Sequence, residues 1–161
     1  MIVVVADTSP LNYLIQINCD HILPALYERV FVPAAVIEEL DHPKSVAAVR
    51  AWLTSVPSWL VVEQVAEPAD LRLARLDPGE RQAIQLAKRE HADLLLMDEK
   101  LGVRIAREEG LAVTGTLGVL LQSAKRDLVD LETTLTNLQS TDFRCTRRVM
   151  EEVRRRSKAS T

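Results

Sequence analysis

Two aspartates each follow directly after a short apolar stretch. Asp7 comes after residues 2–6, and Asp98 comes after residues 94–97. Uninterrupted apolar runs of this length are typical of strands that are buried on both faces of a parallel sheet. Ligands of open parallel sheets bind beyond the carboxyl ends of the strands. If these two strands are neighbours, both carboxylates lie at the same edge and could act together on a ligand.

Each aspartate also has a purely local interpretation. Asp7 would serve as a turn residue or a helix cap, although Ser9 ahead of Pro10 is the better match to an N-cap followed by proline at the first helical position. Asp98 would cap the helix that begins after it. We therefore expect Ser9 to cap the first helix, which leaves Asp7 without a local task, whereas both interpretations of Asp98 stay open.

Two glutamates are placed by helical geometry. In the helix predicted after Pro33, Glu38 points away from the apolar stripe and Glu39 lies at its margin, from where a side chain reaches a cleft. Glu80 lies on the apolar face of a later helix. A carboxylate in that place must cap the helix, pair with a cation or bind a ligand. Asp77 and Glu80 also fit an Asp-headed capping box, so a structural and a functional role are both open for Glu80.

These carboxylates, gathered in one cleft, would repel each other and have raised pKa values without a counter-ion. A divalent cation would relieve this repulsion. Oxygen ligands without thiolate or histidine clusters favour Mg²⁺ or Mn²⁺ over zinc, and the two cysteines match no zinc or redox spacing. Such ions activate water and stabilise the leaving oxygen of a phosphodiester, so the residues predict metal-assisted phosphodiester hydrolysis.

The elements that must position these side chains are strands that alternate with helices. This alternation predicts an α/β fold in which helices cover both faces of a parallel sheet. The length of 161 residues favours one domain. Strands are expected over residues 2–6, 30–32, 60–62, 94–97 and 112–114. A helix is expected to open at residues 9–10, and further helices are expected over residues 21–27, 33–40, 44–54, 77–90, 99–109, 116–126 and 128–138 and from about residue 146.

Composition excludes several classes of protein. The 47% hydrophobic and 27% charged residues argue against a disordered chain, and no apolar stretch approaches the roughly 20 residues of a membrane span. We therefore expect a cytoplasmic protein.

Net charge is −3, yet residues 143–161 carry +5 and residues 1–142 carry −8. We interpret 1–142 as the body of the domain and 143–161 as its basic, helical tail, which contacts RNA phosphates, docks on an acidic partner or only solubilises a helix end.

Four blocks of this sequence resemble the PIN domain: residues 7–9, 36–40, 79–84 and 95–99. Residues 115–121, after residues 104–106, are similar to its branch called domain of unknown function 3368, which is grouped with VapC-like toxins. The resemblance covers roughly residues 1–128. It implies a three-layer α/β/α sandwich with a central parallel sheet. It also implies a Mg²⁺- or Mn²⁺-dependent endoribonuclease that cleaves RNA with metal-activated water, forms homodimers and is often bound by an antitoxin.

The resemblance assigns roles residue by residue. The family's four acids match Asp7, Glu39, Glu80 and Asp98 in chain order. Of these, Asp7, Glu80 and Asp98 are expected to hold the cation, and Glu39 is expected to complete the acidic ring and orient the attacking water. Met97 stands where the family often carries a hydroxyl residue before its fourth acid.

Four further residues are candidates for substrate contact. Thr8 or Ser9 matches the hydroxyl that the family places beside its first acid. Lys100 and Arg104 lie one turn apart after Asp98, where either cation could meet a phosphate or simply belong to a solvated helix face.

Two alternative functions are a non-catalytic binding module and a response-regulator receiver. A non-catalytic PIN-like module would bind RNA or protein without cutting, although all four acids are present here. A response-regulator receiver would need a phospho-acceptor aspartate at the end of its central strand, and residues 60–62 end in Glu63. Gly102, Gly115 and Gly118 are also too isolated to form a phosphate-binding loop.

Overall fold

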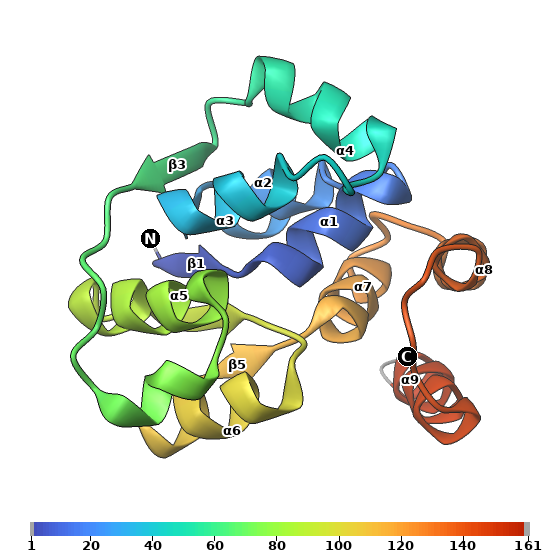
Figure 1. Cartoon of the computed structure of the whole chain (residues 1–161). Coiled ribbons are helices and arrows are strands. Elements are labelled where there is room, and N and C mark those ends of the chain that lie inside the picture. The colour runs from blue at the N-terminus through green and yellow to red at the C-terminus, as the bar shows by residue number, and fades with distance from the viewer. Residues whose placement is uncertain (1, 160–161) are drawn as a thin grey trace.

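A computed structural model describes residues 2–159 of the chain (Figure 1). Five strands in these residues form one sheet in which every neighbouring pair is parallel. Its order is β3-β2-β1-β4-β5, so strand order reverses between β1 and β4. The strands are β1 (Val4–Ala6), β2 (Val30–Pro33), β3 (Leu60–Glu63), β4 (Leu94–Leu96) and β5 (Val113–Thr114).

Helices cover both faces of this sheet, which confirms the predicted α/β/α sandwich. In Figure 1, α5 and α6 lie below β1, and α1, α2 and α4 lie above it. The helices are α1 (Thr8–Gln16), α2 (Ile22–Tyr27), α3 (Ala34–Leu40), α4 (Ala47–Trp52), α5 (Pro78–Arg89), α6 (Lys100–Glu108), α7 (Thr116–Lys125), α8 (Leu131–Gln139) and α9 (Arg147–Lys158), with 3-10 turns at η1 (Leu53–Ser55) and η2 (Leu71–Arg75).

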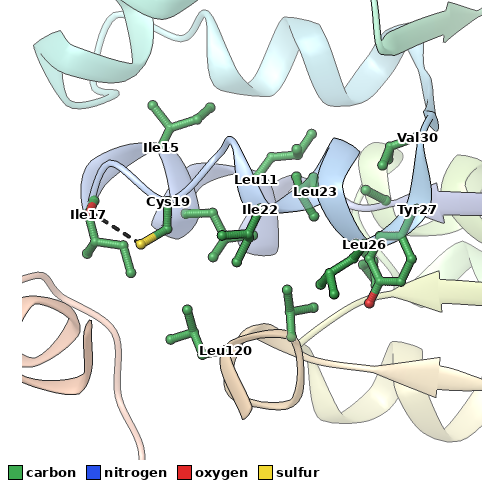
Figure 2. Close-up of a cluster of buried hydrophobic side chains, with 14 of the residues drawn as sticks. Leu11, Ile15, Ile17, Cys19, Ile22, Leu23, Leu26, Tyr27, Val30 and Leu120 are labelled. Carbon is green, nitrogen blue, oxygen red and sulfur yellow. Dashed lines mark hydrogen bonds between the residues drawn. The ribbon is translucent and has the colours of Figure 1, made fainter. Parts of the chain in front are cut away.

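The sheet separates two hydrophobic cores because successive side chains of a strand point to opposite faces. Val4 and Ala6 of β1 belong to the larger core, whereas Val5 belongs to the smaller one under α5 and α6. Figure 2 shows α1, α2 and α7 supplying the larger core. The side chains labelled there are Leu11, Ile15, Ile17, Cys19, Ile22, Leu23, Leu26, Tyr27, Val30 and Leu120.

The predicted N-cap of the first helix is wrong. Helix α1 begins at Thr8 and Asp7 occupies the N-cap position, although its side chain makes no capping hydrogen bond. Ser9 lies inside the first turn and its hydroxyl donates to Asp98. A contact with a distant part of the chain has thus replaced the local cap that the Ser-Pro pair favours.

The segment 44–54 is less helical than predicted. Helix α4 starts only at Ala47, and η1 follows it. Val49 of α4 is buried, whereas Val46, which precedes the helix, is 48% exposed. The short helix therefore presents a narrower apolar face than the sequence indicates.

The C-terminal tail forms a helix, as predicted, and the helix is anchored. The Thr146 hydroxyl accepts a hydrogen bond from the Val149 amide and so caps α9. Met150 and Val153 on α9 are buried in the larger core. Among residues 2–159, no helix combines the length and the apolar character needed to cross a membrane.

Candidate functional site

The predicted neighbours β1 and β4 do lie side by side. Ala6 pairs with Leu96, and the Asp7 amide donates to the Leu96 carbonyl at 2.9 Å. Asp7 and Asp98 therefore emerge at the same edge of the sheet, at the point where strand order reverses. This is the edge at which open α/β sheets bind their ligands.

Asp7 is a buried carboxylate with an unsatisfied oxygen. The residue is only 3% exposed, and its Oδ1 has no hydrogen-bond partner among residues 2–159. Burial raises the pKa of Asp7 well above its ordinary value, and repulsion from Glu80, Asp77 and Glu39 raises it further, against a hydrogen bond from the Thr8 amide. Such a group is costly to bury unless a donor or a cation meets it.

Glu39 is held in place from two sides. The Thr8 hydroxyl donates to Oε2 at 2.5 Å, and the Gly79 amide donates to Oε1 at 2.7 Å. A Cβ at residue 79 would lie 2.5 Å from Oε2, so only glycine leaves room for this carboxylate. Burial raises the pKa of Glu39, and the two hydrogen bonds oppose that shift. Glu38 is exposed, as the helical geometry predicts.

Glu80 has the structural role that its spacing suggested. Asp77 Oδ1 accepts from the Glu80 amide at 2.9 Å, and Glu80 Oε2 accepts from the Asp77 amide at 3.3 Å, which completes a capping box on α5. The same carboxylate is partly buried and has other acids around it. Burial, with repulsion from Asp77, Glu99 and Glu39, raises the pKa of Glu80 to about 7. The capping role therefore does not remove Glu80 from the acidic site.

Asp98 does not cap the helix that follows it. The N-cap of α6 is Glu99, which makes no side-chain capping bond. Instead, Asp98 Oδ1 accepts from the Thr116 amide at 2.8 Å, and Oδ2 accepts from the hydroxyls of Thr116 at 2.6 Å and Ser9 at 2.8 Å. Three donors from α7 and α1 thus fix the orientation of this carboxylate.

Sequence reasoning missed Thr116 and the two glycines beside the acids. Thr116 is fully buried, and a Cβ at Gly115 would lie 2.5 Å from Asp98 Oδ1. The available signal was a glycine and a threonine directly after the last strand, at the same edge of the sheet as Asp98. Thr116 and Ser9 provide hydroxyls to Asp98, while Met97 is buried against Gly102.

The first turn of α1 connects the parts of the site. Thr8 binds Glu39, Ser9 binds Asp98, and Asp7 lies in the same turn. Within residues 2–159, no three His, Cys, Asp or Glu side chains converge closely enough to enclose a metal ion by themselves. The donors nevertheless fit Mg²⁺ or Mn²⁺, because Mg²⁺ sites commonly use only one or two carboxylates and keep several waters. The free Oδ1 of Asp7 is the clearest position for such an ion.

Lys100 and Arg104 lie beside Asp98, one of the four acids. Both line an open cavity of about 530 Å³ together with Asp98 and Arg107. Arg104 also lies 4.0 Å from Glu108, a weak surface pair. Positive side chains on α6 thus border the carboxylate edge of the sheet.

Comparison with known proteins identifies the family. The model of domain of unknown function 3368, described as a PIN domain, matches residues 3–159. The match extends beyond residues 1–128, which the four blocks and the branch motif cover, and includes α8 and α9. No curated protein and no solved structure matches the chain. PIN domains are in general nucleases, and this chain belongs to the PIN-domain family called domain of unknown function 3368.

Proposed function

We propose that this protein is an endoribonuclease that hydrolyses RNA phosphodiesters with the help of Mg²⁺ or Mn²⁺. The observation that carries the proposal is Asp7, a buried carboxylate with a free oxygen and other acids close enough to raise its pKa. A cation at this point would satisfy the oxygen and neutralise the repulsion. The nuclease-like fold of the family supports the same conclusion.

The chain's own residues divide the work. Asp7 would bind the ion directly, and Glu80 and Asp98 would bind it through water. The ion, when bound, makes water more acidic and stabilises the departing oxygen. Ser9 and Thr116 keep Asp98 in one orientation. Thr8 and Gly79 do the same for Glu39, so that its carboxylate is positioned to accept a hydrogen bond from the attacking water.

RNA must approach an acidic body, so cations near the site are needed. Lys100 and Arg104 on α6 are available beside Asp98 and would contact the phosphates that flank the scissile bond. The basic tail is less available for this task. Arg154 pairs with Glu132 at 2.8 Å, and Arg155 and Arg156 pair with Glu152 at 2.6 and 2.9 Å. These pairings favour the α6 cations over the tail as the principal phosphate contacts.

The resemblance to VapC-like toxins adds two finer proposals, a homodimer and a cognate antitoxin as partner. From the composition of the chain we also propose a location in the cytoplasm. Sedimentation of the purified protein tests the dimer, and co-purification with the product of an adjacent gene tests the antitoxin.

Two adjacent glutamates provide a matched test of the nuclease. A pool of single-stranded RNA is incubated with wild-type protein, Glu39→Gln or Glu38→Gln, in Mn²⁺ or in EDTA. We expect cleavage by wild type and Glu38→Gln in Mn²⁺, at least about a hundredfold less by Glu39→Gln, and none in EDTA. RNA binding without cleavage by the wild type would favour the non-catalytic binding module. Equal cleavage by both variants would contradict the assigned site.

A further inference from the structure

A second hollow adjoins the acidic site. It has a volume of about 320 Å³, is lined by Thr8 and Glu39 of the site, and shares no lining residue with the cavity beside Asp98. Its walls come from α1, from the end of α3 and from the loop between α3 and α4. We call it the amide hollow, after Asn12 and Gln16, which line it together with His42, Lys44, Val46 and Asp142.

The amide pair offers a donor and an acceptor side by side. Asn12 and Gln16 lie one turn apart on α1, both half-buried, and Gln16 Nε2 donates to Asn12 Oδ1 at 3.1 Å. This bond fixes the two amides relative to each other. It leaves the Asn12 amino group as a donor and the Gln16 oxygen as an acceptor for a ligand. Asn and Gln use such a combination to read the edges of nucleobases.

The rest of the hollow suits a flat, neutral ring better than a phosphate. Two carboxylates, Glu39 and Asp142, are in the lining against one cationic side chain, Lys44, so the lining is on balance unfavourable to a phosphate. Val46 is 48% exposed and provides an apolar surface for the face of a ring. His42 Nδ1 accepts from the Lys44 amide at 3.0 Å, which holds the imidazole ring in the wall of the hollow.

We propose that the amide hollow binds the nucleobase next to the scissile phosphate and that Asn12 and Gln16 select it. A donor beside an acceptor can pair with an edge of any base, because each base presents an acceptor beside a donor. The carboxylates of Glu39 and Asp142 add further acceptors to the lining. They favour adenine, cytosine or guanine, which carry an exocyclic amino group, over uracil, which carries none. Because Thr8 and Glu39 belong both to the hollow and to the acidic site, the bound base lies within about one nucleotide of the cleavage point. This inference rests on the proposed nuclease function.

The first test is to sequence the ends that the protein makes in a random RNA pool with Mn²⁺. The wild type should enrich adenine, cytosine or guanine over uracil at one position beside the cut by at least about fivefold. Asn12→Ala and Gln16→Ala should each reduce that enrichment while total cleavage of the pool continues. Asn137→Ala, which removes an exposed amide on α8 outside the hollow, should leave the enrichment unchanged. Cleavage without base preference, or a preference that survives both substitutions, would overturn the proposal and leave the nuclease function intact.

A second test does not depend on cleavage. Binding of labelled oligo-adenylate and oligo-uridylate is measured by fluorescence anisotropy in EDTA, with wild type and Asn12→Ala. Tighter binding of the adenylate by at least about fivefold, lost in Asn12→Ala, would support the hollow even if no nuclease activity were found. Equal affinity of the wild type for both oligomers would overturn it.

Discussion

Asp7, Glu39 and Asp98 are held in three different ways at the scale of single residues. Asp7 is buried with a free oxygen, Glu39 is fixed by Thr8 and Gly79, and Asp98 is fixed by three donors from Ser9 and Thr116. A carboxylate that is fixed in this way has less freedom to lose when it binds a ligand. The free oxygen of Asp7 is the one that gains most from a cation.

Replacement of Gly79 tests how closely the site is packed. In Gly79→Ala the added methyl would collide with the Glu39 carboxylate, because a Cβ there lies 2.5 Å from Oε2. We expect RNA cleavage to fall at least about tenfold while the fold is kept, since a small misplacement of a catalytic group is costly. The double variant Gly79→Ala with Glu39→Asp, whose shorter side chain withdraws from the methyl, should recover part of the activity. Unchanged cleavage by Gly79→Ala would contradict this role.

Helical geometry sufficed to separate Glu39 from Glu38, and the spacing of Asp77 and Glu80 sufficed to predict the capping box. Thr116 could not be found in this way. Its contact with Asp98 spans 18 residues and depends on how β5 and α7 meet the end of β4. Residues that act through such contacts leave no periodic signal in the sequence.

At the scale of secondary structure, the apolar runs predicted the strands and the pairing of β1 with β4 brought the two aspartates to one edge. The error lay at the start of α1. Ser9 and Pro10 fit a local N-cap, but the Ser9 hydroxyl instead binds Asp98, 89 residues away. Local preference for a cap is worth about 1 kcal/mol, which one charge-assisted hydrogen bond can offset.

Substitutions in helix α9 test whether the basic tail is part of the folded domain. Val153 is 7% exposed and belongs to the larger core, whereas Val149, one turn earlier, is 43% exposed. We expect Val153→Ala to lower the free energy of unfolding by about 1–3 kcal/mol in a single urea transition, and Val149→Ala to change it by less than about 0.5 kcal/mol. A separate early transition for α9, or equal effects of the two variants, would show that the tail is not packed as described.

At the scale of the whole molecule, the net charge of −3 conceals an acidic body, a basic tail and a cationic border on α6. Carboxylates gather at one edge of the sheet, where burial first and repulsion between the acids second raise the pKa values of Asp7, Glu39 and Glu80. Folding without a cation must therefore overcome this repulsion at neutral pH. The arrangement of the acids favours binding of a cation and lowers the stability of the folded protein when no cation is bound.

Burial of the acids, together with the repulsion between them, predicts an unusual dependence of stability on pH. The pKa of Glu80 rises from 4.5 to about 7 on folding, so the folded state binds more protons in that interval and stability falls as pH rises. We expect a loss of about 1 kcal/mol from Glu80 between pH 5 and pH 8, after allowance for solvent screening of a half-exposed group.

Urea unfolding at several pH values measures this loss. Glu80→Gln, which keeps an acceptor for the capping box, should flatten the slope, and saturating Mn²⁺ should raise stability most at high pH. Stability that is constant or rises between pH 5 and pH 8 would contradict the account.

The most direct test of the central claim is calorimetric titration of Mn²⁺ into the wild-type protein and into Asp7→Asn. Asp127→Asn is the matched control, because Asp127 is exposed outside the site and its φ of 56° suits asparagine. We predict that wild type and Asp127→Asn bind Mn²⁺ and that Asp7→Asn binds it at least about tenfold more weakly. Equal affinity in all three proteins, or no binding by the wild type at millimolar Mn²⁺, would contradict a metal site at Asp7.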